Sequence, residues 1–334
     1  MRFEAFREEH LDDAAQLLAQ RHRRDRETRP HLPEKYSENS IARQALEAEW
    51  KKENGTGIVA IKGEEVAGFL LGIPMVDTNR GRSVWIPYAG SAIAAGESAE
   101  LYRHLYAHLA GQWVAKGYFQ HFAQVPAGDA ELVDAWFRLG FGHQQVYALL
   151  DLDEVPAEIR PIDDDLVIRR GTVEDREALR QAAEWNTLHQ AQAPGWNPVL
   201  PEILEETRAG YAGIVDDREA KLWIAERQGE LVGFHVYWPV SPEQEDMIAP
   251  EKCVDLVAAS TRPDMRGTGI GQLLTGFCLQ QVKAEGYRYC RTDWFMLNLL
   301  ASRFWPQQGF QPVMYRLARR MDERIAWANG THRG

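Results

Sequence analysis

Cysteine, long apolar runs and export signals are absent from this sequence or nearly so. Only Cys253, Cys278 and Cys290 occur among 334 residues, at spacings that match neither a zinc site nor a disulfide framework. No stretch approaches the roughly 20 apolar residues of a membrane-spanning helix, and the charged start MRFEAFREEH does not resemble a secretory signal. We therefore expect a soluble protein of the reducing cytoplasm, with no metal site and no membrane partner.

Basic residues are outnumbered by acidic ones. The chain has 38 lysine and arginine residues against 49 acidic ones, a formal net charge of −11. A nucleic acid or an anionic membrane needs basic surface to displace its counterions, so we expect neither as a partner. A neutral or cationic small molecule fits this charge better, although an acidic surface also serves solubility alone.

The chain repeats itself once. IVAIKGEEVAGFLLGIP, which begins at Ile58, matches WIAERQGELVGFHVYWP, which begins at Trp223. Two further windows repeat in the same order. Arg7, Asp13 and Leu17 match Arg169, Asp175 and Leu179, and Trp136, Gly140 and Phe141 match Trp305, Gly309 and Phe310. The length and this repetition predict two related domains, residues 1–150 and 166–334, with the acidic, proline-containing segment 151–165 as linker.

The second half has the pattern of a mixed α/β domain. LVIRR reads as a strand, and Thr172 with Asp175 forms a capping signal ahead of the helical run EDREALRQAAEW. Prolines then break regular structure before a second short helix, and strands alternate with helices beyond residue 221. The expected order is βααβββαβαβ, an α/β (α+β) class with a mixed sheet flanked by helices, and the first half repeats most of it.

A glycine-rich loop, Arg266-Gly267-Thr268-Gly269-Ile270-Gly271, lies between a predicted strand and a predicted helix. Glycines allow successive backbone N–H groups to converge, and a helix N-terminus adds partial positive charge, so the loop suits a pyrophosphate. Its spacing fits neither the dinucleotide fingerprint nor the Walker A motif. On the loop alone, a turn that merely ends a strand is an almost equal alternative.

The context of the loop resembles the GCN5-related N-acetyltransferase (GNAT) superfamily, whose pattern is Val-x-Pro-x-x-Arg-Gly-x-Gly-Ile-Gly followed by Asn-x-x-Ala and Gly-Phe. Thr261 takes the valine position. The remaining positions are matched by Pro263, Arg266, Gly267, Gly269, Ile270, Gly271, Asn298, Ala301, Gly309 and Phe310. Together with the repeat, this resemblance implies two tandem GNAT-like domains and an acetyltransferase that uses acetyl-CoA as co-substrate.

The resemblance also implies the residues that bind CoA. Backbone N–H groups of the loop would hold the pyrophosphate, the preceding strand would pair with the pantetheine arm, and the Ala259 N–H would polarise the acetyl carbonyl. The full set implied is Ala259, Ser260, Thr261, Arg266, Gly267, Thr268, Gly269, Ile270, Gly271, Asn298 and Phe304.

The general acid and the general base lie outside the loop and are predicted separately. An ammonium acceptor must lose a proton before it attacks a thioester, and Asp255, on the same strand as Thr261, is the candidate base. A strand-end cap or an arginine partner is an equal alternative for Asp255, and Asp293 is a weaker candidate. Trp305 stands where many family members have the tyrosine that serves as acid, and indole cannot donate its proton at useful pH. Tyr315 or Tyr237 would substitute, or the thiolate leaves unprotonated.

The first half does not repeat the loop. The corresponding sequence is AAGESAELY, in which Glu97 would repel a phosphate and only Gly96 remains. We expect residues 1–150 not to bind CoA. The acceptor is expected to be a primary amine of a small molecule, and a non-catalytic acyl-CoA sensor is the alternative. An ordinary histidine titrates near neutral pH, which draws attention to His189 and His235, but single histidines without partners in sequence are usually structural. A monomer or homodimer is expected.

Overall fold

The computed structural model describes residues 1–78, 80–156, 165–241 and 246–328. The chain divides into two compact units. The first unit comprises Met1–Tyr147, Pro242–Pro250 and Pro312–Gly334, and the second comprises Ala148–Ser241 and Glu251–Gln311. Across the described residues, no helix combines the length and the apolar character that crossing a bilayer requires.

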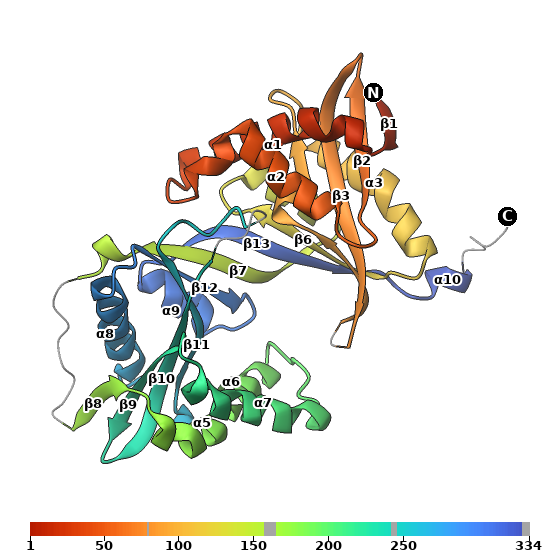
Figure 1. Cartoon of the computed structure of the whole chain (residues 1–334). Helices are drawn as coiled ribbons and strands as arrows, with labels where there is room; N and C mark the ends of the chain where they lie inside the picture. Colours follow the sequence, from red (N-terminus) through yellow and green to blue (C-terminus); the bar gives the residue numbers. More distant parts are fainter. Residues whose placement is uncertain (79, 157–164, 242–245, 329–334) are drawn as a thin grey trace. The chain divides into compact units, whose positions relative to one another are not determined.

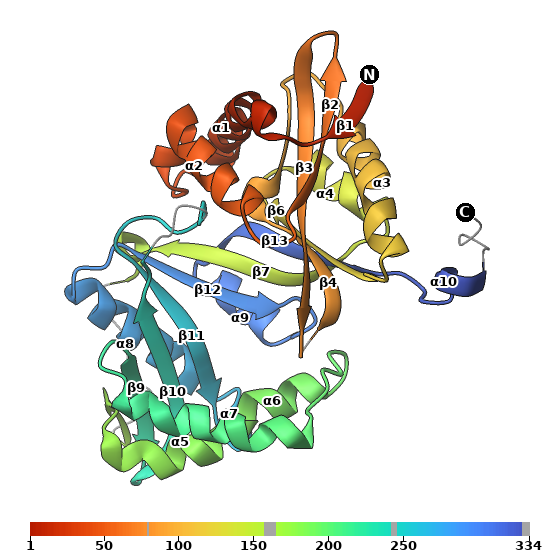
Figure 2. The same cartoon turned by 45° about the vertical axis from the view of Figure 1, so that its right-hand side comes forward.

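The first unit is a mixed sheet with helices on both faces. Its strand order is β1-β2-β3-β4-β6-β13, in which β4 and β6 run parallel. Helices α1 and α2 cover one face and α3 the other (Figures 1 and 2). Its elements are β1 (Arg2–Ala5), α1 (Leu11–Thr28), α2 (Asn39–Trp50), β2 (Thr56–Lys62), β3 (Glu65–Asp77), β4 (Gly81–Ile86), β5 (Ser91–Ile93), α3 (Glu100–Ala115), β6 (Gln120–Pro126), α4 (Ala130–Phe137), β13 (Gln311–Arg320) and α10 (Ile325–Ala328).

The last strand of the chain completes the sheet of the first unit. β13 pairs antiparallel with β6, from Met314 opposite Pro126 to Arg320 opposite Gln120. The buried Arg316 side chain donates a 2.8 Å hydrogen bond to the Gln144 side chain in the same unit. β7 (Gly142–Asp151) passes from the first unit into the second after Tyr147. The sheet of the first unit is therefore built from both ends of the sequence.

The second unit confirms the expected mixed sheet flanked by helices. Its strand order is β12-β11-β10-β9-β8, in which β11 and β12 are parallel. The capping signal is also confirmed, because Thr172 and Asp175 form a reciprocal capping box. The elements are β8 (Leu166–Arg170), α5 (Arg176–Ala182), α6 (Glu184–Ala191), α7 (Pro201–Gly213), β9 (Lys221–Arg227), β10 (Glu230–Pro239), β11 (Cys253–Thr261), α8 (Ile270–Ala284), β12 (Tyr289–Phe295) and α9 (Ala301–Gln307).

Successive side chains along β10 point alternately to the two faces of the sheet in the second unit. Phe234 and Val236 pack into the cluster formed with α5 and the region of α7, where Phe234 contacts the rings of Trp185 and Tyr211. Helices α5, α6 and α7 lie together on this face and α8 lies on the other (Figures 1 and 2). His235, one position along the strand, points to the opposite face. Residues that line the site described below come from both layers.

Two buried imidazoles make the first unit sensitive to acid. Burial lowers the pKa of His22 and of His121 from 6.5 to about 4, whereas burial raises the pKa of Asp25 from 3.8 to about 6. Between pH 6 and pH 4, unfolding therefore takes up two protons at the histidines and releases one from the aspartate. These three groups together should lower the free energy of unfolding by about 1.4 kcal/mol for each pH unit of acidification, because one net proton taken up on unfolding contributes that amount.

Urea unfolding at a series of pH values checks this expectation. His121→Gln removes one of the two histidines, so its profile between pH 6 and pH 4 should be less steep than that of the wild type by about 1.4 kcal/mol per pH unit. A wild-type profile that is already flat, or that rises on acidification, contradicts the assignment.

Candidate active site

Strand β11 loses one of its two neighbours halfway along its length. It pairs with β10 from Val254 to Thr261 but with the parallel strand β12 only from Cys253 to Leu256. A bulge marks the point of separation, because Ala258 faces Val236 and Leu256 faces Tyr237, which leaves Val257 without a partner. Residues 258–261 therefore have one paired edge and one open edge.

The open edge presents backbone groups of Ala259. The Ala259 carbonyl accepts a 3.2 Å hydrogen bond from the side-chain amide of Asn186 on α6, and not from a strand. The N–H and C=O groups of one residue in an extended strand point to the same edge. The Ala259 N–H consequently faces the open edge as well.

The glycine loop joins this strand to α8. Gly267 and Gly269 have φ angles of +77° and +88°, which side chains other than glycine rarely adopt, and Gly269 is the N-cap of α8. A Cβ at Gly271 would lie 3.2 Å from the Thr261 hydroxyl oxygen, so this glycine allows the helix to approach β11 closely. The first N–H groups of α8 have no partner within the helix, and they make its N-terminus suitable for an anion.

Arg266 ties the loop to its surroundings. Its guanidinium donates hydrogen bonds to the backbone carbonyl oxygens of Thr261, at 3.3 Å, and Trp185, at 3.2 Å. Burial lowers the pKa of Arg266, but an arginine keeps its charge in proteins. The arginine therefore contributes positive charge beside the loop while holding the loop against β11 and α6.

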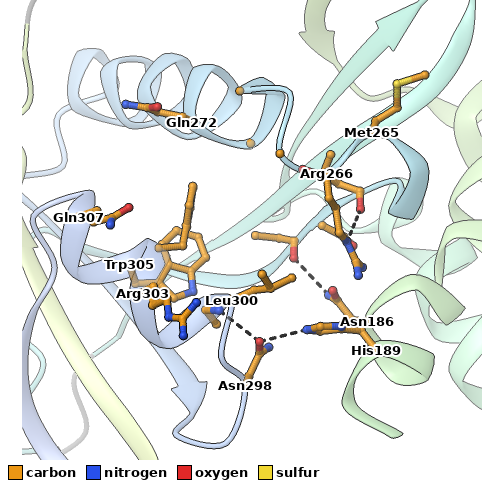
Figure 3. A pocket seen from close by; sticks show the side chains of 18 of the residues that line it. Asn186, His189, Met265, Arg266, Gln272, Asn298, Leu300, Arg303, Trp305 and Gln307 are labelled. Atoms are coloured by element: carbon orange, nitrogen blue, oxygen red, sulfur yellow. Dashed lines mark hydrogen bonds between the residues drawn. The ribbon is translucent and has the colours of Figure 1, made fainter. Parts of the chain in front are cut away.

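The open edge, the loop and α9 enclose one cavity of about 460 Å³ (Figure 3). Its lining residues are Asn186, His189, His235, Ala259, Ser260, Thr261, Met265, Arg266, Gly267, Gly269, Gly271, Gln272, Asn298, Leu300, Ala301, Arg303, Phe304, Trp305 and Gln307. Most of the residues implied to bind CoA are thus brought together. Ile270 is instead fully buried, and Thr268 is exposed with its hydroxyl bonded to the Met265 carbonyl.

Two of the residues expected to be catalytic are not among those that line the cavity. Both carboxylate oxygens of Asp255 accept hydrogen bonds from Arg291, at 2.6 and 2.7 Å, so the arginine partner considered as an alternative is present. Tyr315 belongs to the first unit, where it packs edge-on against His143 with ring centroids 4.4 Å apart. Trp305 does line the cavity, and it is 7% exposed and packs against Phe310.

Helix α6 supplies polar side chains that the sequence did not single out as site residues. Figure 3 shows His189 and Asn186 beside Asn298 and β11. The Asn298 side-chain oxygen accepts the Ala301 N–H at 3.1 Å and lies 3.1 Å from His189 Nε2. Because this oxygen only accepts hydrogen bonds, His189 Nε2 carries the proton. A neutral His189 then has its lone pair on Nδ1.

In the first unit an arginine occupies the position that is open in the second. Ser91 is the counterpart of Ala259, because it pairs with β3 as Ala259 pairs with β10. Its carbonyl accepts a 2.5 Å hydrogen bond from the buried guanidinium of Arg21. Arg21 also lies 3.3 Å from the Asp25 carboxylate and 4.6 Å from the centre of the Tyr88 ring. Glu97, in the segment that replaces the loop, is paired with Lys62. A buried, paired arginine leaves no comparable open edge here.

Comparisons with known proteins bear on the second unit and on the whole fold. Residues 184–310 match the acetyltransferase (GNAT) family model. The curated mycothiol acetyltransferase of Streptomyces coelicolor is 34% identical over 79 residues, which are 22% of this chain and 23% of that protein. The match therefore spans less than a quarter of the relative's length.

Two solved structures share the fold over nearly the whole chain. A GCN5-related N-acetyltransferase from Sphaerobacter thermophilus is 16% identical, covers 96% of this chain and 95% of its own, and gives a TM-score of 0.57. A tandem GNAT protein from the clavulanic acid biosynthesis pathway is also 16% identical, covers 96% and 98%, and gives 0.52. The stretch that matches the acetyltransferase (GNAT) family model, residues 184–310, contains both the strand with an open edge and the glycine loop.

Proposed function

We propose that this protein transfers an acetyl group from acetyl-CoA to a primary amine of a small molecule, and that the cavity of the second unit is its active site. The observation that carries the proposal is the meeting of two features in one cavity. These are the open edge of β11 and the glycine loop at the start of α8. The first suits an extended amide-containing chain and the second suits a phosphate group.

The loop fits the pyrophosphate of CoA. A Cβ at Gly267 would meet no atom within 4 Å, so the backbone there is open to a ligand. The N–H groups that follow belong to the first turn of a helix of 15 residues, whose dipole favours an anion. Arg266 adds a full positive charge beside them.

The backbone of β11 would hold the reacting end of the cofactor. Acetyl-CoA supplies an activated acetyl group whose carbonyl oxygen gains negative charge during transfer. The Ala259 N–H, which faces the open edge, donates to that oxygen in our proposal. One preorganised donor of this kind contributes about 3 kcal/mol in acyl transfer. Asn186, bonded to the Ala259 carbonyl, helps to fix the orientation of the strand there.

We assign the removal of the amine proton to His189. It lines the cavity, its Nε2–H is held by Asn298, and its Nδ1 is left as the proton acceptor. Asp255 is the competing candidate, but both of its oxygens are engaged by Arg291.

Calorimetric titration with acetyl-CoA tests the proposal first. We expect one equivalent per chain, because the second unit has the loop and the open edge while the first has Glu97 and the buried Arg21. Two equivalents would overturn the assignment of the first unit as non-binding. If no acetyl-CoA binds, the proposed function is wrong.

Turnover is the second part of the test. Release of free CoA thiol is followed with a panel of primary amines under the conditions of the titration. Saturable release with at least one amine supports an enzyme. Tight binding of one equivalent without release for any amine would favour an acyl-CoA sensor instead.

A further inference from the structure

A buried histidine, His235, lines the cavity beside Trp305, the residue that stands where the family pattern has a tyrosine acid. His235 is 3% exposed, and its ring centre lies 6.3 Å from that of Trp305. It is also directly opposite Ala259 in the β10–β11 ladder. Directly opposed residues of an antiparallel pair put their side chains on the same face. His235 therefore lies next to the strand position where the acetyl group is proposed to bind.

His235 forms a hydrogen bond with a tyrosine in the core. Its Nδ1 lies 3.0 Å from the hydroxyl of the fully buried Tyr237. Burial lowers the pKa of His235 to about 3 and raises the pKa values of Tyr237 and Cys278 well above their usual range. All three groups are consequently neutral at physiological pH.

Acid and base strength decide the direction of this hydrogen bond. A phenol is a stronger acid than a neutral imidazole, and an imidazole nitrogen is a good acceptor for it. The favoured arrangement is therefore Tyr237 O–H to His235 Nδ1. In a neutral ring the remaining proton then lies on Nε2, and the side chain lines the cavity.

The first unit contains another tyrosine–histidine pair, at a different place in the fold, whose direction is fixed by a backbone group. Tyr106 O–H lies 2.7 Å from His121 Nδ1, and His121 Nε2 lies 3.2 Å from the Tyr118 carbonyl oxygen. A carbonyl only accepts, so His121 Nε2 donates and Nδ1 accepts from the tyrosine. His121 donates its Nε2–H to the backbone, whereas the His235 side chain lines a cavity.

We propose that His235 Nε2–H donates a hydrogen bond to the departing sulfur of CoA, and that Tyr237 holds the imidazole in the tautomer that allows this. The inference rests on the proposed function. As the amine nitrogen bonds to the acetyl carbon, the carbon–sulfur bond breaks and its electron pair stays on sulfur as a thiolate. His235 keeps its proton throughout, and the amine proton goes to His189. A neutral imidazole serves here as a donor in place of the missing tyrosine.

The test measures the thiol of bound CoA and does not depend on turnover. A thiolate has an ultraviolet absorption band that the neutral thiol lacks, so the difference absorbance of the complex with free CoA, followed against pH, gives the pKa of the bound thiol. A hydrogen bond to the anion should lower that pKa, increasing the thiolate fraction about tenfold to a hundredfold over the same complex without the donor. His235→Met removes the donor and should abolish the shift. His235→Gln, whose amide is a donor, should restore part of it.

Tyr106→Phe is the control, because it breaks a buried tyrosine–histidine hydrogen bond of the same chemistry in the first unit. It should leave the pKa of the bound thiol unchanged. If CoA binds to the wild type and amines are acetylated, but His235→Met has the same bound-thiol pKa as the wild type, this inference is wrong and the proposed function stands. Failure of CoA to bind the wild type overturns the proposed function itself.

Nitrogen NMR of histidine-labelled wild-type protein provides a readout that does not require the methionine variant to fold. The expected spectrum has the His235 proton on Nε2 with Nδ1 as acceptor, and this pattern should be lost in Tyr237→Phe. A proton on Nδ1 in the wild type would overturn the inference.

Discussion

Replacing Gly267 by glutamate should weaken the binding of acetyl-CoA at least a hundredfold. The new side chain starts at a backbone position with φ of +77° and brings a carboxylate to the loop proposed to hold the pyrophosphate. Repulsion between like charges in a partly enclosed site costs several kcal/mol, and a hundredfold corresponds to about 2.7 kcal/mol. Calorimetric titration with acetyl-CoA measures the loss.

Gly96 provides a control with nearly the same backbone. Its φ angle is +89°, and a Cβ there would also meet no atom within 4 Å. Gly96→Glu should therefore cost the same conformational strain, about 1–2 kcal/mol, and should leave acetyl-CoA binding unchanged. Equal effects of the two substitutions would show that strain, and not the phosphate site, explains the loss. Full binding by Gly267→Glu would contradict the assignment of the loop.

Local chemistry explains what the sequence predicted well. The capping box of Thr172 and Asp175 and the glycine loop ahead of α8 depend on residues only a few positions apart. Such features are visible in sequence because the backbone conformation and the residue type constrain each other directly. The alternation of strands and helices beyond residue 221 also follows from local sequence patterns.

Pairings between distant segments could not be predicted in the same way. The parallel register places Asp255 opposite Arg291, and only this register turns a candidate base into half of an ion pair. Strand β13 belongs to the first unit, although its sequence position suggested the second domain. A strand's apolar pattern shows that it has a buried face but does not show which sheet it joins.

Helix α6 was missed for a related reason. Its run WNTLHQA stands just before a cluster of prolines and glycine, which suggested irregular structure. None of its side chains is fully buried, so it lacks the apolar stripe that identifies a helix in sequence. Its polar residues instead face the cavity, as Asn186 and His189 show. A functional helix of this kind becomes recognisable only when its neighbours are known.

Replacing His189 by glutamine should lower kcat about a hundredfold while leaving the affinity for acetyl-CoA unchanged. Glutamine keeps an amide N–H that reaches the Asn298 oxygen, so the hydrogen bond that orients the side chain survives. The basic nitrogen is lost, and a positioned general base contributes about a hundredfold to ten-thousandfold. Steady-state rates with a responsive amine, combined with calorimetry, separate the two quantities.

Asp255→Asn distinguishes the competing assignment. Asparagine has no negative charge and only one acceptor atom, so it cannot accept from Arg291 at both positions, and the folded state should lose about 1–3 kcal/mol, the usual contribution of hydrogen bonds to a charged group. If Asp255 is a structural partner of Arg291, kcat should stay within a few fold of the wild type at a temperature where the variant is folded. If instead Asp255→Asn loses kcat at unchanged acetyl-CoA affinity and His189→Gln retains it, the carboxylate is the base. In that case Arg291 would have to release Asp255 when the amine binds, because a carboxylate that already accepts two hydrogen bonds from a guanidinium is poorly placed to take a proton.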